Sequence, residues 1–377
     1  MKLYAKGKIV VTDKLQDIGG AEIVLAQICE SVKPEFVFTS TISNKHDWKK
    51  ILGVNNIISP SWGILVRNRH VWFMLYPVIC FLMSRVSLYS DESIFVYSSS
   101  ASKHVNSHSK QKVVLYSNYP ARGIFFPREF FKSSLILYFV YPLLVLFRSF
   151  EARCIKGYKK IYVISEVCRE AYKKAVGVDS VVLNCPINND YYSFFESSNH
   201  RPYPLGGTVN DKLTFVLVSR LVDWKNLDYV FNYFESQNKF KLLVVGDGPL
   251  MELYRKQHNK NCTFLGFLSS NEKMRVLTDS CGLVFPSVQE WSLVAIEANA
   301  LGLPVIGVRC GGTVETQVEY TQSSVPATCI VYDTPDLDSL SSAMEQFLDV
   351  SWDSTFINYY SKRFKPSVFR EEIKKII

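Results

Sequence analysis

Short runs of β-branched and other apolar residues alternate with helical patterns along most of the chain. The first half contains KIVVT (8–12), SIFVYSS (93–99) and KVVLYS (112–117), and the second half repeats the scheme with LTFVLVS (213–219) and FKLLVVG (240–246). These runs are apolar throughout rather than alternating, which is typical of parallel strands buried on both faces. We therefore expect an α/β protein with doubly wound parallel sheets, which bind ligands at the carboxyl ends of their strands.

A polar segment rich in Gly and Pro, SSNHRPYPLGGTVNDK (197–212), separates the two sets of predicted strands. The chain of 377 residues is long enough for two domains of ordinary size. We expect an N-terminal domain over 1–200, a C-terminal domain over 201–350, and a helical segment over 351–377 that packs back toward the N-terminal domain.

Basic charge is concentrated in the first half of the chain. Residues 1–200 hold 25 Lys and Arg against 15 Asp and Glu, whereas residues 201–377 hold 18 against 20, so +10 and −2 sum to the net charge of +8. The first half also contains two apolar aromatic runs, 71–84 and 133–147, which are shorter than the ~20 residues of a membrane-spanning helix.

Two interpretations of these runs stay open. They are either buried core helices or a surface that docks in the plane of an anionic membrane. The positive charge lies beside apolar runs rather than on a polar face. We therefore expect an anionic membrane surface, and no nucleic acid, as a partner of the basic N-terminal domain.

Nine cysteines are scattered along the chain, and no two of them form a CxxC pair. This spacing excludes a zinc ribbon and a thioredoxin-type site, and it favours a reducing compartment over a disulfide framework. Residues 1–13 are interrupted by lysines and lack the apolar run of a signal peptide. We expect a cytoplasmic location, with peripheral attachment to the cytoplasmic face of the membrane.

Gly19 and Gly20 follow the first predicted strand and open a helical pattern. Glycine lets the backbone approach a ligand closely, and a helix N-terminus attracts anions. The pair is either a phosphate-binding turn or an ordinary helix start. The full GxGxxG spacing is missing, so a nicotinamide or flavin site is not supported.

Two cations follow the predicted strand at 213–219. Arg220 comes directly after the strand, and Lys225 lies where the next helix should begin. Arg supplies a planar fork and Lys a point charge, so the pair can clamp a diphosphate; the alternative is a solvated charge pair. Gly246 opens a GDGP turn after the next strand, which either lines a ligand pocket or has a structural role alone.

The most informative motif follows the predicted strand at 282–287, where a short polar loop leads into a helix. The backbone amides of Trp291, Ser292 and Leu293 lie at the start of this helix, where they can meet phosphate or sugar oxygens. Glu297 lies further inside the helix among apolar residues. A buried carboxylate needs hydrogen-bond partners, and the two hydroxyls of a ribose would satisfy it.

Together these segments resemble the retaining glycosyltransferases of family 4, nearest to their mannosyltransferase-like branch. The resemblance rests on the Gly-Gly-Ala-Glu start, the SRLVDWKN segment, the GDGP turn, and SVQEWSLVAIEANALGLPVIG followed by GGTVE, in the expected order over nearly the whole chain. It implies the GT-B architecture, with two Rossmann-like domains facing a cleft. It also implies a GDP- or UDP-linked sugar donor held mainly by the C-terminal domain, transfer with retention, and no metal or other cofactor.

Carried over residue by residue, the resemblance implies that Gly19 and Gly20 approach the donor phosphates. Arg220 and Lys225 would neutralise the diphosphate leaving group, and Glu297, which matches the second Glu of the family's Glu-x7-Glu motif, would hold the ribose. Backbone amides would be presented to sugar and phosphate by the residues at the helix start, which are Trp291, Ser292 and Leu293.

Several positions depart from the family pattern. Gln289 stands at the first Glu of the motif and Glu290 comes one residue later; both are catalytic candidates, but Gln289 cannot supply negative charge. Ser292 stands where Gly is usual. Asn118 stands where the mannosyltransferase branch has His, so it keeps a hydrogen-bonding role without proton transfer. His104 is the other candidate on the acceptor side; the alternative is a structural or solvated histidine.

We therefore expect a retaining, metal-independent hexosyltransferase that moves a sugar from a nucleoside-diphosphate sugar to a hydroxyl of a lipid-linked or growing glycan. Positioning and cation stabilisation of the departing diphosphate would lower the barrier. The departures at Gln289 and Asn118 support a second hypothesis, a non-catalytic glycosyltransferase-like subunit that binds a partner or a glycan. A nucleotide-sugar epimerase of the same architecture is the third.

Overall fold

The computed structural model describes residues 1–68, 71–72, 75–98, 100–126, 134–197, 208–209, 212–321 and 326–377. The chain divides into two compact units. Unit 1 comprises Met1–Pro186 and Pro366–Ile377, and unit 2 comprises Ile187–Lys365.

The divisions between the units differ from the expected boundaries at residues 200 and 351. Helix α9 (Asp190–Ser197) packs on helix α13 (Leu293–Ala300), so the chain enters unit 2 before residue 200. Helix α16 (Ser354–Ser361) also packs on α13, so only the segment from Pro366 onward returns to unit 1.

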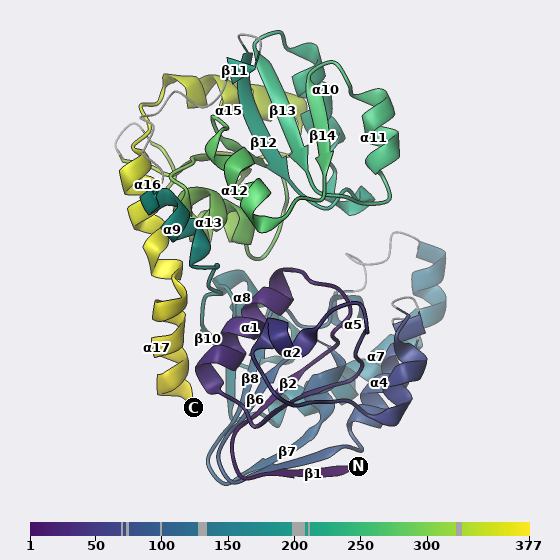
Figure 1. Cartoon of the computed structure of the whole chain (residues 1–377). Helices are drawn as coiled ribbons and strands as arrows, with labels where there is room; N and C mark the ends of the chain where they lie inside the picture. Colours follow the sequence, from purple (N-terminus) through teal and green to yellow (C-terminus); the bar gives the residue numbers. More distant parts are fainter. Residues whose placement is uncertain are drawn as a thin grey trace. The chain divides into compact units, whose positions relative to one another are not determined.

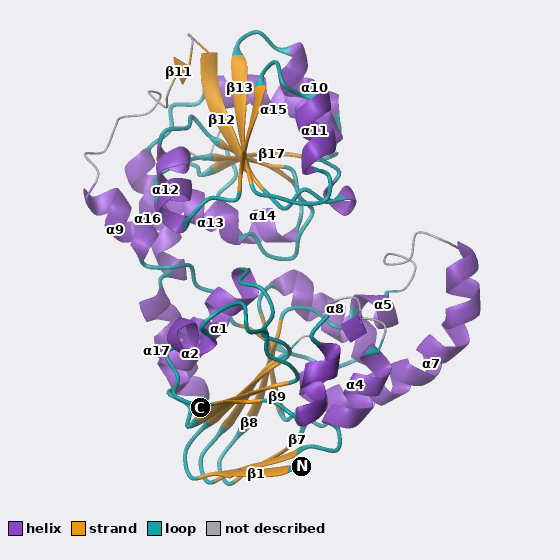
Figure 2. Cartoon of the chain, turned by 45° about the vertical axis from the view of Figure 1, so that its right-hand side comes forward, coloured by secondary structure: helices purple, strands orange, loops and turns teal. Residues whose placement is uncertain are grey.

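Unit 1 is built on a seven-stranded parallel sheet of order β10-β9-β8-β6-β2-β3-β4 (Figures 1 and 2). Numbered along the chain and read from the β4 edge, this order is 3-2-1-4-5-6-7, so the direction of winding reverses between β2 and β6. Its strands are β2 (Ile9–Thr12), β3 (Phe36–Thr39), β4 (Ile57–Ile58), β6 (Ile94–Tyr97), β8 (Val113–Ser117), β9 (Lys160–Val163) and β10 (Val181–Val182).

Helices cover this sheet in two groups. One group contains α1 (Gly20–Val32), α2 (Trp48–Leu52) and α17 (Pro366–Ile376), and α1 contacts both of the others. The second group contains α4 (Tyr76–Met83), α5 (Arg122–Phe125), α7 (Ser134–Lys156), α8 (Glu166–Val176) and the 3-10 helix η2 (Ala101–His104). A further 3-10 helix, η1, spans Ser61–Val66. Strands β2, β3 and β6 are buried at every position, which explains why their sequences are apolar without alternation.

A second, three-stranded parallel sheet of order β1-β5-β7 lies at one end of unit 1 (Figure 1). Its strands are β1 (Lys2–Ala5), β5 (Ser87–Ser90) and β7 (Asn106–Ser109). Each of them leads through a short turn into a strand of the main sheet, namely β2, β6 or β8. The small sheet therefore lies at the amino ends of the main strands. No sequence pattern predicts this sheet, because its strands are short and partly polar.

Unit 2 contains six parallel strands in the order β14-β13-β12-β15-β16-β17, and β11 pairs antiparallel with β12. Along the chain this order reads 3-2-1-4-5-6, so the switch point lies between β12 and β15. The strands are β11 (Thr208–Val209), β12 (Lys212–Val218), β13 (Phe240–Val245), β14 (Cys262–Gly266), β15 (Leu283–Phe285), β16 (Val305–Val308) and β17 (Cys329–Tyr332).

Helices lie on both faces of the unit 2 sheet (Figure 2). Besides α9, α13 and α16 they are α10 (Asp228–Ser236), α11 (Met251–Gln257), α12 (Ser270–Thr278), α14 (Gly311–Thr316), α15 (Leu337–Asp349) and the 3-10 helices η3 (Asp223–Lys225) and η4 (Lys362–Phe364). Aromatic rings fill the core under α10 and α15; the rings of Phe215 and Phe347 lie 5.4 Å apart, edge to face. The α/β prediction with parallel sheets in both halves is confirmed.

Candidate functional site

The carboxyl ends of neighbouring strands β12 and β15 bring two of the predicted motifs to one edge of unit 2. Residues 219–227 follow β12, and residues 286–292 follow β15. Because these strands pair in parallel on either side of the switch point, the two loops flank the crevice where doubly wound sheets bind ligands.

The GDGP turn after β13 is packed directly against the loop after β12. A Cβ added to Gly246 would lie 2.0 Å from the carbonyl oxygen of Ser219, and one added to Gly248 would lie 2.2 Å from that of Leu221. The amide of Leu221 also donates to the carbonyl of Asp247 at 3.0 Å. Both glycines are therefore needed for close backbone contact. These contacts support a structural role for Gly246, which was the alternative to lining a ligand pocket.

Arg220 and Lys225 lie on the same loop but in different environments. Arg220 is exposed directly after β12, and the described residues offer it no ion pair. Lys225 ends the 3-10 helix η3 and is only 9% exposed; its ammonium lies 4.5 Å from the ring centroid of Trp224. The loop thus presents one exposed guanidinium and holds one ammonium against an indole face.

The loop after β15 is held by the turn that opens α14. The amide of Gly312 donates to the carbonyl of Gln289 at 2.9 Å, and a Cβ on Gly312 would lie 2.9 Å from the Trp291 backbone. Trp291 is buried edge to face against Phe364, at 5.5 Å between ring centroids. Glu290, next to Gln289, is partly buried.

Two buried polar groups at this helix start have no hydrogen-bond partner among the described residues, the indole nitrogen of Trp291 and the hydroxyl of Ser292. Ser292 is the N-cap of α13, and Leu293 is the first helical residue. The first amides of a helix have no intrahelical acceptor. Unsatisfied donors in a buried loop are costly, so a bound polar ligand would stabilise this segment.

The carboxylate of Glu297 has a charged partner within unit 2. Its side chain is 10% exposed, and its Oε2 lies 2.8 Å from the ammonium of Lys273 on α12. The buried Tyr191 side chain lies near the same carboxylate; burial and then the Glu297 charge raise the pKa of Tyr191 strongly. The Lys273 ammonium lies 5.4 Å from the Tyr191 ring centroid.

The apolar neighbours of Glu297 in the sequence predict that its carboxylate needs partners, but nothing in the sequence identifies Lys273 or Tyr191 as those partners. Neither belongs to a motif: they come from α12 and α9, which lie far from α13 in the sequence. A lysine on the amphipathic helix α12 has no sequence feature that separates it from an ordinary surface lysine.

Gly19 and Gly20 lie at the start of α1 in unit 1, where both are exposed. The amide of Gly19 donates to Oε2 of Glu22 at 2.9 Å, so one donor of this helix start is already used within the helix. Burial raises the pKa of the Glu22 carboxyl above its ordinary value, although its backbone hydrogen bonds oppose the shift.

The two loops at the switch point of unit 1 are tied together by Asp13. Its carboxylate accepts from the hydroxyl of Ser98 at 2.5 Å and from the amides of Ser100 and Ser102 at 3.1 and 3.0 Å. Asp13 follows β2 and Ser98 follows β6, so this carboxylate shapes the carboxyl edge of the unit 1 sheet. Asn118 follows β8 at the same edge, where it is partly buried.

His104 does not fit the acceptor-side role expected for it. Its ring is 4% exposed, lies parallel to the Phe150 ring at 4.7 Å, and meets Oε1 of Glu151 at 3.1 Å. The ammonium of Lys103 lies 2.9 Å from the other oxygen of Glu151. A side chain enclosed in this way cannot reach a substrate. His104 is the last residue of η2, and it is buried because η2 packs on α4 and α7.

The Lys103–His104–Glu151 cluster also contains the only grouping of metal-ligand atoms found in the described residues. Cys80, His104 and Glu151 each offer a ligand atom, all within 4.8 Å of one another. Burial alone would raise the pKa of Glu151, but the Lys103 ammonium and His104 lower it to about 2. Lys103 therefore already supplies the positive charge that this carboxylate requires.

Comparison with known proteins relates the chain to enzymes that handle activated sugars. Residues 206–363 match the family described as Glycosyl transferases group 1. An uncharacterized glycosyltransferase of Methanocaldococcus jannaschii is 27% identical over 118 residues, 29% of this chain and 30% of the relative. A GDP-mannose-dependent monoacylated alpha-(1-6)-phosphatidylinositol monomannoside mannosyltransferase of Corynebacterium glutamicum is 29% identical over 146 residues, 35% of this chain and 36% of the relative. The chain thus spans about a third of these relatives' length.

Solved structures are similar over nearly the whole chain. Anabaena HepE in complex with UDP-glucose superposes with a TM-score of 0.66 at 14% identity, covering 98% of this chain and 99% of the other. The lipopolysaccharide outer core galactosyltransferase WaaB superposes with a TM-score of 0.60 at 15% identity, covering 97% and 98%. The expected GT-B fold is confirmed by this similarity.

Proposed function

This chain belongs to the group 1 glycosyl transferases (family 4), and we propose that it transfers a sugar, with retention of configuration, from a nucleoside-diphosphate sugar to a hydroxyl of a lipid-linked or growing glycan. The observation that carries the proposal is the carboxyl edge of unit 2, where Arg220 and the start of α13 follow adjacent strands. Cations and free helix-start amides on one edge are the chemistry that a diphosphate requires.

In this proposal Arg220 and Lys225 stabilise the charge that develops on the departing diphosphate. The exposed guanidinium of Arg220 can form two parallel hydrogen bonds to phosphate oxygens, and Lys225, held against Trp224, adds a point charge. Fixed cations of this kind lower a barrier because they need no reorganisation as charge develops. We propose that these two side chains do so without a required metal ion.

Glu297 would hold the ribose of the donor. Lys273 bonds one carboxylate oxygen and Tyr191 contacts the same group, so the carboxylate is oriented before a donor arrives. The amides of Trp291, Ser292 and Leu293 would bind phosphate and sugar oxygens, and Gly246 would shape the turn beside them.

Gln289 and Glu290 would lie nearest to the transferred sugar. Gln289 is neutral, so it would hydrogen-bond a sugar hydroxyl rather than stabilise positive charge. No strong base is needed, because the leaving phosphate of a retaining enzyme can take the acceptor proton on the same face. In unit 1, Gly19 and Gly20 would approach the donor phosphates and Asn118 would hydrogen-bond the acceptor.

We propose that unit 1 docks on an anionic membrane, which agrees with a lipid-linked acceptor. Helix α4 buries Ile79 and Met83 but exposes Val78 and Phe81, and α7 exposes Leu146 at 72%. One face of α4 is thus buried as in a core helix, and its exposed apolar face is the one that supports the docking proposal. No helix in the described part of the chain is both long and apolar enough to cross a bilayer. An amphipathic surface of this type fits in-plane docking beside basic side chains.

The experiment that tests the proposal combines donor binding with turnover. Thermal stabilisation of the purified chain is measured with GDP-mannose, UDP-glucose and related nucleotide sugars, since a ligand of the native state raises apparent stability. Slow hydrolysis of the stabilising donor is then followed with and without EDTA. We expect stabilisation and hydrolysis that EDTA does not abolish. Stabilisation without any hydrolysis or transfer would favour the non-catalytic binding subunit. The absence of both stabilisation and hydrolysis would overturn the proposal.

A further inference from the structure

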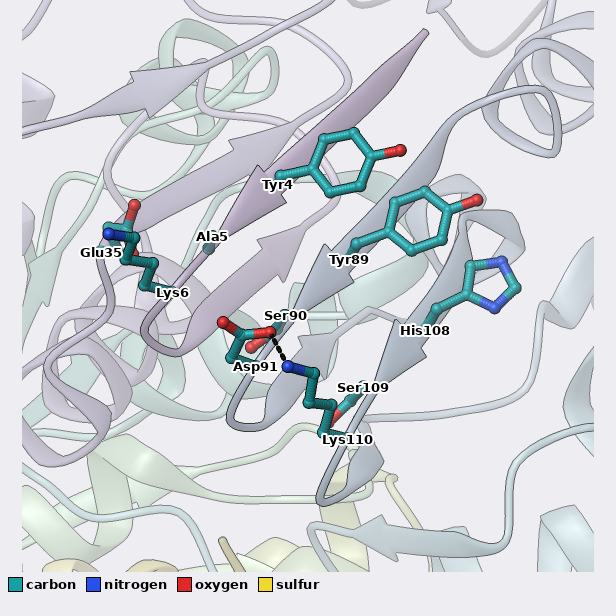
Figure 3. Close-up of a pocket in the computed structure, with 10 residues that line it drawn as sticks. All are labelled: Tyr4, Ala5, Lys6, Glu35, Tyr89, Ser90, Asp91, His108, Ser109 and Lys110. Atoms are coloured by element: carbon teal, nitrogen blue, oxygen red, sulfur yellow. Dashed lines mark ion pairs between the residues drawn. The ribbon is translucent and has the colours of Figure 1, made fainter.

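A cavity of about 680 Å³ lies at the small sheet β1-β5-β7 of unit 1 (Figure 3). Tyr4, Tyr89 and His108 are in register across this sheet, and their rings stack at 4.7 and 4.8 Å between centroids with interplanar angles of 12° and 15°. The ring faces are therefore turned toward each other, and the ammonium of Lys110 is paired with Asp91 at 2.7 Å. Cross-strand contacts of this kind stabilise a sheet, so we assign the cavity no ligand.

A different set of contacts surrounds the points where the chain passes between the two units. The chain enters unit 2 at Ile187 and leaves it after Lys365. We term the segments next to these points, 187–192 and 361–365, the crossing segments. They are bonded to each other, because the amide of Ile187 donates to the carbonyl of Phe364 at 3.2 Å.

Tyr192 adds two further contacts between the crossing segments. Its hydroxyl donates to the carbonyl of Ser361 at 2.7 Å, and the ammonium of Lys365 lies 4.9 Å from its ring centroid. Tyr192 and Ser361 are both buried. The crossing segments therefore pack together as one piece of unit 2 rather than as two independent strands of chain.

One crossing segment lies against the loop 286–292, which leads into α13. Phe364 packs on Trp291 with 5.5 Å between ring centroids and an interplanar angle of 79°, and both rings are buried. Trp291 directly precedes Ser292, the N-cap of α13, and this N-cap forms no side-chain capping bond. The ring contact, rather than a side-chain cap, therefore fixes the residue before the helix start.

The same crossing segment also holds the second support of the loop 286–292. The guanidinium of Arg363 donates to the carbonyl of Glu315 in α14 at 3.0 Å. The start of α14 in turn holds the loop, because the amide of Gly312 donates to the carbonyl of Gln289 at 2.9 Å. The 3-10 helix η4 thus contacts both elements that fix this loop.

The other crossing segment lies against the interior of α13. Helix α9 packs on α13, and Tyr191 of α9 is buried near the carboxylate of Glu297. Its neighbour Tyr192 is bonded to Ser361. Helix α9 therefore joins the Glu297 carboxylate to the second crossing segment.

We propose that Phe364 is a positioning residue for the donor nucleotide, and that through its contact with Trp291 a bound nucleotide orders both crossing segments. This inference rests on the proposed function, in which the helix start of α13 and Glu297 bind the donor. A ligand that fixes the loop 286–292 also removes motion from the side chains packed on that loop. The ordering then reaches the two points at which the chain passes between the units.

The test is hydrogen exchange of the full chain, measured by mass spectrometry with GDP and with UDP, added separately. We expect one of these nucleotides to slow exchange in the site segments 219–227 and 286–297 and also in both crossing segments. Phe364→Leu should raise the dissociation constant of that nucleotide about fivefold, because the loop is no longer held in its binding conformation before the ligand arrives. It should also remove the slowing in the crossing segments.

Variants of Trp291 test whether the effect passes through the ring pair. Trp291→Phe keeps a ring opposite Phe364 and should retain most of the affinity and the slowing, whereas Trp291→Leu should lose both. The double variant Trp291→Leu/Phe364→Leu should lose no more than Trp291→Leu, because both changes remove the same contact. Phe347→Leu is the matched control: it alters another buried Phe–Trp pair of unit 2, with Trp352 at 5.0 Å, and should leave the dissociation constant unchanged.

The outcomes separate this inference from the proposed function. Slower exchange in the site segments of the native protein, with no change in the crossing segments, would overturn the inference and leave the proposed function standing. Additive losses in the double variant, or an equal loss in Phe347→Leu, would also overturn the inference. Unchanged exchange in all four segments with both nucleotides would overturn the inference and the proposed function together. The readings on the native protein do not depend on whether a variant folds.

Discussion

The ammonium of Lys273 lies 2.8 Å from Oε2 of Glu297, and this ion pair joins α12 to the interior of α13 in unit 2. The pair is nearly enclosed, with side chains 20% and 10% exposed. A carboxylate that is held by a fixed cation keeps one orientation, whereas a solvated one rotates. If Glu297 holds the donor ribose, Lys273 is a positioning residue for donor binding.

We expect Lys273→Met to raise the KM for the nucleotide sugar about tenfold, equivalent to about 1.4 kcal/mol of binding, with a smaller effect on kcat. Steady-state kinetics at varied donor concentration measures this split. Lys273→Arg should restore most of the affinity, because it keeps the cation. Equal loss in the Met and Arg variants, or a loss in kcat alone, would contradict the positioning role.

Replacing both Arg220 and Lys225 with Ala should abolish turnover, because our proposal assigns both side chains to the charge of the departing diphosphate. Circular dichroism should show that the fold persists. Arg255→Ala is the control: Arg255 is an exposed guanidinium of unit 2 that pairs with Glu252 on its own helix. Unchanged donor affinity and turnover in the double variant would refute the assignment of these residues.

Gly248→Ala should destabilise unit 2 by about 3 kcal/mol, because the new Cβ would lie 2.2 Å from the Leu221 carbonyl oxygen. Gly266→Ala serves as the comparison: Gly266 has φ of +75° but nothing within 4 Å of its added Cβ, so only backbone strain of about 1 kcal/mol is expected. Urea unfolding of both variants, read by hydrogen exchange in unit 2, measures the difference. A smaller loss for Gly248→Ala than for Gly266→Ala would show that the two turns are not tightly packed.

Leu146→Asp should reduce sedimentation of the protein with anionic vesicles several-fold, because it places a charge on the exposed apolar face of α7. Leu253→Asp on α11 is the control, since this leucine is exposed in unit 2. Binding should also weaken as salt is raised, because the attraction to anionic lipid is screened. Equal sedimentation with neutral and anionic vesicles would remove the membrane proposal.

The buried cluster around Glu151 predicts a pH dependence of stability in unit 1. The folded-state pKa of Glu151 is about 2, below its ordinary value of 4.5. A lowered folded-state pKa contributes stability that is fully present above pH 4.5 and is lost as the pH falls toward 2. The shift corresponds to a contribution on the order of 3 kcal/mol at neutral pH.

Glu151→Gln should therefore destabilise unit 1 at pH 7, by about 3–5 kcal/mol because Lys103 is left buried without its carboxylate. The difference in the unfolding free energy of unit 1 between the native protein and this variant should shrink between pH 4.5 and 3. Hydrogen exchange of α7 amides across this range measures it. The double variant Lys103→Met/Glu151→Leu should lose less stability than Glu151→Gln. A loss of stability in Glu151→Gln that does not depend on pH would contradict the lowered pKa assigned to Glu151.

The amino-acid sequence by itself determined the fold class and the order of the motifs. Continuous apolar runs between helical patterns can be satisfied only by strands buried on both faces, so the α/β architecture followed from local composition and spacing. The same reasoning placed Arg220 and the start of α13 after strands, because the carboxyl ends of parallel strands share one edge.

Only the tertiary structure decided which distant side chains meet. Lys273 and Tyr191 reach Glu297 from other helices. His104 is enclosed by Glu151 and Phe150, whereas the sequence left open an acceptor-side role or a structural one. The row of Tyr4, Tyr89 and His108 arises from the register of three strands that are distant along the chain. Such contacts depend on packing between segments with no local signal, and hydrophobic periodicity carries no information about them.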